Sequence, residues 1–412
     1  MAELKDRIAE ARARFEKMCA DPVALDLTRG KPSAAQLDLS RDLMTALGPD
    51  DFVDGHGNDC RNYGVPDGLP EARALFGNLL DVPAQGILIG ENSSLTLMHD
   101  AVSAAVLHGV PGGSGPWHGQ GASLLCPVPG YDRHFALTEH LGLAMTNVDV
   151  SEGGLDIEAI ERLAASDERV KGIWIVPKYQ NPVGYTLSPE EVRALATMKT
   201  AAPDFRILWD NAYVVHHIDE KLDTVANVLT ACEQAGNPDR VLIFGSTSKI
   251  TFAGAGVSAF GGSEANVGWM RTYRGLRTIG ADKLNQLRHI RFFGDEDGVR
   301  QHMQRHAELL RPKFDAVQRG LTERLAGTGL ATWTRPRGGY FVSLDTQPGK
   351  ARRVFELAAK AGVKLTPVGA TYPYGNDPED RNIRIAPTLP PNDELERAIT
   401  VLATAVLCAA DD

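Results

Sequence analysis

The chain has 412 residues, of which 43% are hydrophobic and 23% charged, a composition that excludes a disordered protein and is typical of a globular one. Its net charge of −10 argues against a nucleic-acid-binding protein, which would carry a basic patch. The length exceeds what one simple core requires, so we expect two domains, or a large domain with a smaller companion.

The cysteines and the N-terminal residues predict a cytoplasmic protein. The five cysteines are scattered and form no CxxC pair, which fits a reducing compartment and no structural zinc site. The first residues, MAELKDRIAEARARF, are charged and lack the apolar segment of a secretory signal. No apolar run is long enough to span a bilayer. His216 and His217 lack nearby partner ligands, so we predict no bound metal.

The apolar pattern predicts an α/β protein. Residues 2–19 place apolar side chains at alternating steps of four and three, which indicates an amphipathic helix. A loop-rich segment follows. From about residue 86, short apolar runs alternate with helical stretches, at 87–90, 123–128, 145–150, 172–177, 206–210 and 240–245. Buried strands that alternate with helices predict a mostly parallel sheet covered on both faces.

The C-terminal third has a different pattern. A long helical stretch begins near Val299, and the segments GGYFVSL and NIRIAP after it have the pattern of strands. We therefore expect an N-terminal arm with part of a small domain over 1–50, a large domain over 51–300, and a smaller α+β domain over 301–412. In parallel sheets, ligand-binding groups gather at the carboxyl ends of the strands.

Lys249, in GSTSKITFAGAG, directly follows the predicted strand 240–245. It is either a surface lysine or the amine that forms an imine with an aldehyde cofactor. To act as a base near neutral pH, its ordinary pKa of about 10.4 would have to fall. Burial and cationic neighbours lower such a pKa. Ser246 and Ser248 add hydroxyl groups suited to a phosphate.

Polar side chains also follow the two strands before it. Asp210 ends the strand 206–210 and is either a helix cap or structural ion pair, or a carboxylate beneath a pyridinium nitrogen. There it would keep the nitrogen protonated, so that the ring can draw electrons from a carbanion. Tyr213 could offer its hydroxyl group to the same ring. Asn181 is either a turn residue or an amide donor to a phenolic oxygen.

Three further segments have two interpretations each. Asn92, Ser93 and Ser94 open a helix after a strand, where they either cap the helix or help its N-terminus to bind a phosphate. Tyr131 lies just past another strand, either in the core or stacked on a cofactor ring. Arg384 alternates with two isoleucines in NIRIAP, so it points away from their face, into solvent or toward a carboxylate that it clamps.

In their order and types, these motifs resemble fold-type I pyridoxal-phosphate (PLP) enzymes of the class I aminotransferase superfamily. That superfamily shares NPVG, the strand-end aspartate with a tyrosine three residues later, SxSK, and a late arginine in a strand. The resemblance covers nearly the whole chain. In detail, TRGKPS, GENSSL, PGYDRH and STSKITFAGAGV are similar to the aspartate aminotransferase subgroup often labelled "MocR-like".

The resemblance implies a role for each motif residue. Lys249 would hold PLP as an internal aldimine, and Asp210 would pair with the pyridinium nitrogen. The other ring contacts would be Tyr213, Asn181 and Tyr131, and the phosphate contacts Asn92, Ser93, Ser94, Ser246 and Ser248. Three residues would bind the substrate. Gly30 and Arg384 would contact its α-carboxylate, and Asn181 would lie beside them. Tyr63 would reach the phosphate of the other subunit's cofactor, which implies a homodimer with shared sites.

The implied reaction is a ping-pong transamination of aspartate with 2-oxoglutarate. A dicarboxylate needs a second cation, for which Arg133 is our first choice among Arg29, Lys31, Arg133 and Lys283. The chain departs from the superfamily at Val257, where an arginine usually pairs with the phosphate.

Three rival functions remain open at the level of sequence. They are another PLP-dependent reaction such as β-elimination or decarboxylation, a regulatory ligand-binding protein, and a nicotinamide-dependent oxidoreductase. The last is suggested only by the α/β pattern, because no GxGxxG follows an early strand.

Overall fold

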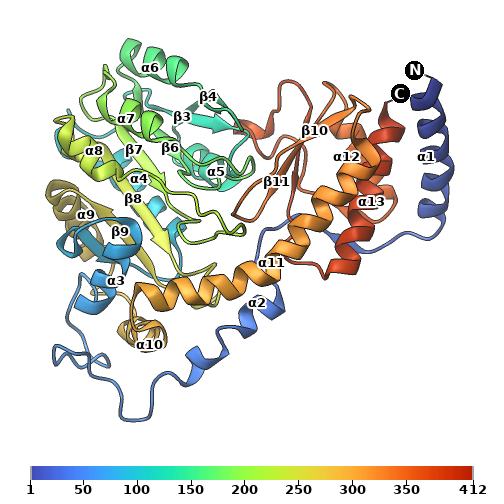
Figure 1. Cartoon of the computed structure of the whole chain (residues 1–412). Coiled ribbons are helices and arrows are strands. Elements are labelled where there is room, and N and C mark those ends of the chain that lie inside the picture. The colour runs from blue at the N-terminus through green and yellow to red at the C-terminus, as the bar shows by residue number, and fades with distance from the viewer. Residues whose placement is uncertain (1, 411–412) are drawn as a thin grey trace.

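The computed structural model describes residues 2–410 and consists of a large and a small sheet with their covering helices (Figure 1). The helices are α1 Ala2–Ala20, α2 Ala34–Asp38, α3 Pro70–Leu80, α4 Ser94–His108, α5 Asp132–His140, α6 Ile157–Ser166, α7 Pro189–Thr197, α8 Val228–Gln234, α9 Glu264–Arg277, α10 Lys283–Phe293, α11 Glu296–Leu325, α12 Ala351–Lys360 and α13 Asn392–Ala409. Among the described residues, no helix has the length and hydropathy needed to cross a membrane.

The large sheet has eight strands in the order β2-β9-β8-β7-β6-β3-β4-β5. Their bounds are β2 Ile87–Ile89, β3 Ser123–Val128, β4 Ala144–Ser151, β5 Gly154–Leu155, β6 Val170–Ile175, β7 Arg206–Asp210, β8 Val241–Ser246 and β9 Ser258–Gly262. The five strands β8, β7, β6, β3 and β4 run parallel, whereas β9 is antiparallel to both of its neighbours and β5 to β4. The predicted, mostly parallel α/β sheet is confirmed.

Helices cover both faces of this sheet, because its strands are apolar on both sides. In β7, Ile207 and Trp209 pack into one buried cluster with side chains of α3, α6, α7 and α8. Leu208 points the other way, into a second cluster with side chains of α4, α5 and α9. Successive side chains of a strand alternate between faces, so a continuous apolar run such as this one requires cover on both sides.

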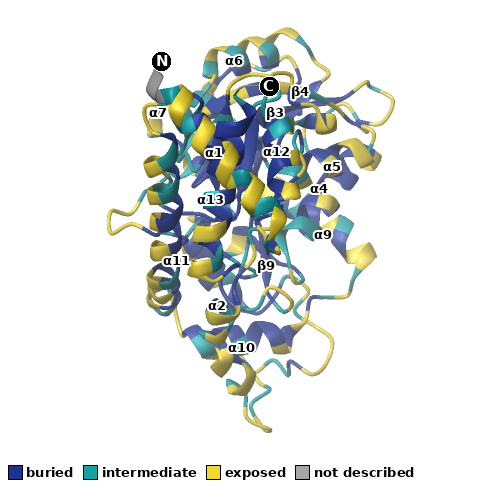
Figure 2. Ribbon diagram, turned by 90° about the vertical axis from the view of Figure 1, so that its right-hand side faces the viewer, coloured by how far each residue is buried: buried dark blue, intermediate teal, exposed yellow. Residues whose placement is uncertain are grey.

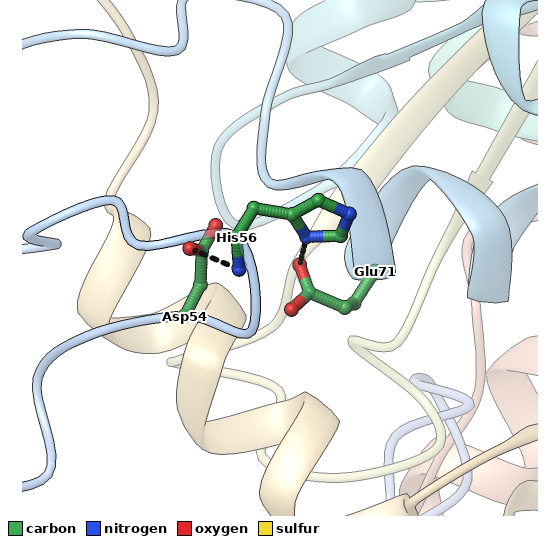
Figure 3. A group of neighbouring side chains, drawn as sticks. All are labelled: Asp54, His56 and Glu71. Atoms are coloured by element: carbon green, nitrogen blue, oxygen red, sulfur yellow. Dashed lines mark hydrogen bonds and ion pairs between the residues drawn. The ribbon is translucent and has the colours of Figure 1, made fainter.

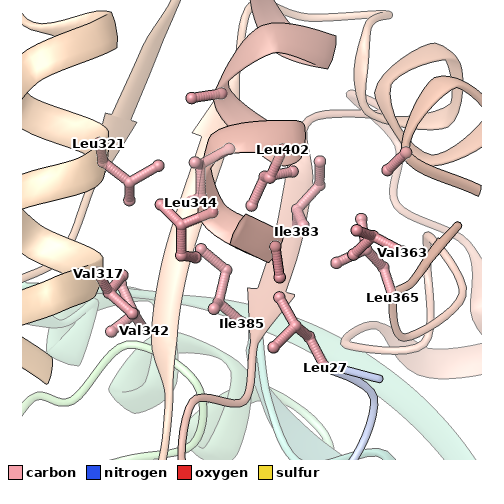
Figure 4. Packing of buried hydrophobic residues seen from close by; sticks show 14 of the residues in the cluster. Leu27, Val317, Leu321, Val342, Leu344, Val363, Leu365, Ile383, Ile385 and Leu402 are labelled. Atoms are coloured by element: carbon pink, nitrogen blue, oxygen red, sulfur yellow. The ribbon is translucent and has the colours of Figure 1, made fainter. Parts of the chain in front are cut away.

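The smaller part of the fold is built around an antiparallel sheet in the order β10-β11-β13, with bounds β10 Ala331–Trp333, β11 Val342–Thr346 and β13 Asn382–Ile385. Its core joins this sheet to α11 and α13, through residues that include Leu321, Leu344, Ile385 and Leu402 (Figure 4). The helix α1 packs on α13 by one face and exposes the other (Figure 2).

Two connections tie the N-terminal residues to the C-terminal part. The short strands β1 Leu25–Asp26 and β12 Val363–Lys364 pair in parallel. The helix α11 runs between the two parts of the fold, with contacts to α10 and α3 as well as to α13 (Figure 1). The segment around Gly30 packs on the C-terminal part, where the Thr28 and Lys31 carbonyls accept hydrogen bonds from Thr366 and Thr388.

Candidate active site

The side chains that follow β6, β7 and β8 meet at one edge of the large sheet. Asp210 is the last residue of β7 and pairs in register with Phe244 of β8. Three residues after β8, Lys249 donates a hydrogen bond from Nζ to the Tyr213 hydroxyl group at 3.2 Å. The ammonium group also lies 4.3 Å from the centre of the Tyr213 ring. The parallel course of the strands explains this meeting, because their carboxyl ends share an edge.

Asp210 and Asn181 are both buried, and each keeps one oxygen without a partner. Asp210 is 2% exposed and Asn181 is 3% exposed. Neither Asp210 Oδ1 nor Asn181 Oδ1 has a hydrogen-bond partner among the described residues. A buried polar atom without a partner costs about 1–3 kcal/mol. Asp210 ends β7 and Asn181 follows β6, and the carboxyl ends of these strands share the edge at which Lys249 lies, so these two oxygens are available to a ligand there.

His134 is a buried member of the site that the sequence interpretation missed. Its Nε2 lies 3.0 Å from Asp210 Oδ2, and its ring is stacked on that of Trp174 at a centroid distance of 4.2 Å. Tyr131 meets the same imidazole edge to face at 5.0 Å, and burial raises the pKa of its phenol to about 12. The signal was present in PGYDRH, since a helix start places residues 131 and 134 on one side.

Polar groups from three segments contact the loop that follows Lys249. The Asn92 side chain accepts a hydrogen bond from the Gly256 amide at 2.6 Å and donates one to the Ala253 carbonyl at 3.2 Å. A Cβ on Gly256 would lie 2.9 Å from the Ser248 nitrogen, so these three segments converge. The hydroxyl groups of Ser246 and Ser248 are 2.9 Å apart.

Ser93 caps α4 by accepting a hydrogen bond from the Leu95 amide at 3.2 Å, and Ser94 is the first residue of that helix. The N-terminus of a 15-residue helix therefore lies directly after Asn92. Val257 is 2% exposed, and its amide bonds to the Thr247 hydroxyl group at 2.9 Å, so this position supplies an apolar side chain and no charge.

Arg384 is buried rather than solvated, although it lies on a strand of the smaller sheet. It is 6% exposed, and its Nη1 donates to Asp132 Oδ1 at 2.8 Å. Its guanidinium carbon lies 4.8 Å from the centre of the Phe341 ring. Gly30 packs directly against the same Phe341 ring, because a Cβ at this position would collide with it. Asp132, like His134, was not singled out from the sequence.

Other predicted residues lie at the surface. Tyr63 is 79% exposed, and Arg29, Lys31 and Arg133 are also exposed, whereas Lys283 is buried. No contact joins Tyr63 or Arg133 to Lys249 within the described chain. Arg133 nevertheless stands between Asp132 and His134 at the start of α5.

Asp54, His56 and Glu71 form a separate cluster whose oxygen and nitrogen atoms all lie within 4.8 Å of one another (Figure 3). Asp54 Oδ1 accepts hydrogen bonds from the amides of His56 and Asn58, and Glu71 Oε1 accepts one from Gly55. These carboxylates close a surface loop, so we assign no metal to them.

Comparison with known proteins identifies the family. The model of the family described as aspartate amino-transferase matches residues 1–412. The chain is 46% identical, over 97% of its length and 93% of the relative, to a protein of Corynebacterium glutamicum named aspartate aminotransferase. It is 51% identical, over 97% of its length and 94% of the relative, to a protein of Mycolicibacterium smegmatis named as an aminotransferase.

Solved structures agree with the sequence relatives. A crystal structure of an aspartate transaminase from Corynebacterium glutamicum superposes with a TM-score of 0.96 at 45% identity, over 100% of this chain and 97% of the other. The α-aminoadipate aminotransferase LysN of Thermus thermophilus, complexed with N-(5'-phosphopyridoxyl)-L-leucine, shares the fold with a TM-score of 0.76 at 19% identity, over 98% and 97% of the two chains. The chain thus belongs to the aspartate aminotransferase family and is an aminotransferase of PLP fold type I.

Proposed function

We propose that this aminotransferase transfers the amino group of aspartate to 2-oxoglutarate, giving oxaloacetate and glutamate, with PLP bound by Lys249. The similarity to the aspartate aminotransferase sequence and the aspartate transaminase structure from Corynebacterium glutamicum supports aspartate as the donor. The observation that carries the proposal is the hydrogen bond from the half-buried Lys249 to the buried Tyr213. The Asp210 carboxylate acts electrostatically on that tyrosine and keeps one oxygen without a partner among the described residues. We also infer that the enzyme acts in the cytoplasm, because none of its five cysteines forms a disulfide bond among the described residues.

The residues at this edge of the sheet fit PLP. When bound, this cofactor supplies an aldehyde that reacts with amines and a ring that takes up electrons from the substrate carbon. Asp210 Oδ1 is free to accept a hydrogen bond from a protonated ring nitrogen, while His134 holds the other oxygen. We propose that Tyr213 and Asn181 donate to the phenolic oxygen and that Tyr131 covers a ring face.

The phosphate would lie at the start of α4. Four side chains and the amides of this helix end surround that place, namely those of Asn92, Ser93, Ser246 and Ser248, with Ser94 as the first helical residue. Helix N-termini bind anions through free amides and the positive end of the helix dipole. We propose that these donors replace the charge that Val257 does not provide.

The substrate α-carboxylate would bind to Arg384, with Gly30 and Asn181 nearby. Asp132 bonds to Nη1 of this arginine, and Arg384 Nε lacks a partner among the described residues. A carboxylate of the substrate can use that nitrogen in a bidentate contact. Lys249 would then take the α-proton and return it to the cofactor.

A homodimer fits the exposed apolar side chains near Tyr63. Tyr63, Leu276 and Ile279 are 79%, 88% and 63% exposed. A Cβ on Gly280 would lie 3.8 Å from Pro66 Cα, so the loops that carry these residues are neighbours. Exposed apolar residues gathered in this way are typical of an interface. We propose that Tyr63 reaches the partner's cofactor phosphate across it.

For the distal carboxylate of aspartate, we propose Arg133. Replacement of Arg133 by alanine should lower kcat/KM for aspartate by about 10- to 100-fold, the value of a charge-assisted hydrogen bond, and leave that for alanine nearly unchanged. Steady-state assays with both donors measure the difference. Arg29→Ala provides the comparison, as another exposed arginine near the site. An equal loss on aspartate and alanine would argue against Arg133.

An absorbance spectrum tests the proposal as a whole. Purified protein supplied with PLP should show the band of the lysine-bound cofactor. Addition of aspartate should convert that band to the pyridoxamine form and release one oxaloacetate per site. A band that aspartate leaves unchanged would contradict the substrate, and the absence of a band would contradict the assignment of Lys249.

A further inference from the structure

The turn that carries Lys249 leaves two backbone carbonyl groups for donors from distant segments. The amides of Ile250 and Thr251 bond to the Thr247 carbonyl, each at 2.8 Å, but no helix continues after them. In a longer helix, the carbonyls of Lys249 and Ile250 would pair with amides four residues later. Here side chains take the place of those amides.

Buried side chains from three segments bond to these two carbonyls. The Lys249 carbonyl accepts from the Tyr340 hydroxyl group at 3.2 Å and from His216 Nε2 at 3.3 Å. The Ile250 carbonyl accepts from His302 Nε2 at 2.9 Å, and His306 Nε2 lies 3.1 Å from the same His302 nitrogen. All four side chains are at most 2% exposed.

Gln36 of α2 determines which atoms of Tyr340 and His306 donate hydrogen bonds and which accept them. Its Oε1 accepts from the Ser33 amide at 3.1 Å, so the side-chain nitrogen must face the other way. That nitrogen donates to the Tyr340 hydroxyl oxygen at 3.1 Å and to His306 Nδ1 at 3.2 Å. Tyr340 therefore donates its own proton to the Lys249 carbonyl, and His306 accepts on Nδ1.

Arg305 fixes the second imidazole in the same way. Its guanidinium group donates to His302 Nδ1 at 2.9 Å, so the proton of His302 is on Nε2, toward the Ile250 carbonyl. Burial lowers the pKa of His302 to about 4 and that of His306 to about 3, so both imidazoles are neutral at pH 7. The directions of Gln36 and Tyr340 are defined, whereas His302 Nε2 is shared between the Ile250 carbonyl, the Ser40 hydroxyl group and His306 Nε2.

The buried network around Lys249 also reaches Gly30 and Arg384, the residues proposed to bind the α-carboxylate. Phe341, the residue after Tyr340, lies beneath the Arg384 guanidinium and against Gly30. Gln36 follows Gly30 by six residues, at the start of the short helix α2. A continuous set of buried contacts therefore leads from these two residues, through Tyr340, to the backbone of Lys249.

We propose that Tyr340 and Gln36 are positioning residues that fix the backbone of Lys249 and couple it to the binding of the substrate α-carboxylate. The coupling rests on the proposed role of Arg384, whereas the fixing of Lys249 does not. A shift of Phe341 on carboxylate binding moves the Tyr340 hydroxyl group, and the Lys249 carbonyl must follow because no water can replace a buried partner. The lysine amine is thereby held where it can transfer a proton.

The first test uses the apoprotein, which needs neither cofactor nor turnover. Tyr340→Phe removes only the hydroxyl group, and we expect amide hydrogen exchange in residues 247–252 to become about 5- to 10-fold faster through local opening. Tyr179→Phe is the matched control, because its hydroxyl group is also buried and bonded to a histidine, His217 Nδ1, at 2.6 Å. That variant should exchange like the wild type in this segment.

Kinetics and a ligand complete the test. In the loaded Tyr340→Phe enzyme, kcat should fall about 10-fold with little change in KM, as expected for a misplaced reacting group. Maleate, a dicarboxylate, should slow exchange in 247–252 of the wild-type apoprotein and not in Tyr340→Phe. Gln36→Met, which loses both donors, should shift exchange and kcat in the same direction and serves if Tyr340→Phe does not fold.

The outcomes separate the two parts of the inference. Wild-type exchange and wild-type kcat in both variants would overturn it. Faster exchange in Tyr340→Phe without any effect of maleate on the wild type would overturn the coupling and the role of Arg384. Faster exchange together with the loss of the maleate effect would support both parts, whichever amino donor the enzyme uses.

Discussion

Replacement of Lys249 by alanine should abolish transamination and leave the protein folded. The variant lacks the amine that bonds to Tyr213 at the edge of the sheet, and with it the group that would bind the cofactor and carry the α-proton. The fold should survive, because the buried donors of this turn bond to backbone carbonyls, which alanine retains. Steady-state assays and the absorbance band of the lysine-bound cofactor measure the two losses together.

Lys178 provides a matched control for this prediction. It also follows a strand but is buried where Lys249 is half-buried, and burial, reinforced by Arg300, lowers its pKa to about 8. However, its Nζ donates to the Val214 carbonyl at 2.9 Å and not to a group of the site. We expect Lys178→Met to keep its turnover and its cofactor band. Full activity of Lys249→Ala, or a reduced cofactor adduct mapped to Lys178, would contradict the assignment.

Much of the large sheet could be predicted because its strands are short, apolar and separated by helices. The strand 206–210 was located at its observed bounds, and 123–128 likewise. The strand β9 was missed, since its sequence SAFGG follows the small residues of the Lys249 loop and continues their pattern of glycine and alanine. Only its pairing between β2 and β8 identifies it as a strand.

For the candidate site, the sequence could predict which residues follow strands but not which distant side chains they meet. Lys249, Asp210 and Tyr213 stood out because polar groups at the ends of buried strands are unusual. His134, Asp132 and Tyr340 did not, because a histidine, an aspartate and a tyrosine near helix and strand starts are common. Their partners, Asp210, Arg384 and Lys249, are between 76 and 252 residues away in the chain.

Replacement of Asp210 by asparagine should lower kcat by about 10²- to 10³-fold, the expected result of removing one member of a buried charge pair. The asparagine oxygen can still face His134, where Asp210 Oδ2 now lies 3.0 Å from Nε2. Its amide nitrogen then points where Oδ1 is unpartnered, and it presents a donor to a ring nitrogen that must itself be protonated. Stopped-flow measurement of the aspartate half-reaction isolates this loss from product release.

Asp204→Asn separates the chemical effect from the loss of a buried carboxylate as such. Asp204 is fully buried, and it accepts hydrogen bonds from Lys171 Nζ and Trp117 Nε1, each at 2.9 Å. Its replacement leaves the Lys171 charge unpaired, so the free energy of unfolding should fall by about 3–5 kcal/mol. The half-reaction of the protein that remains folded should nevertheless keep its wild-type rate, since neither partner belongs to the site.

Asp210→Asn should show the reverse, with a large loss of rate and a smaller loss of stability, because its carboxylate has no lysine or arginine partner among the described residues. Equal rate losses in the two variants would mean that Asp210 acts through the fold and not on the cofactor ring.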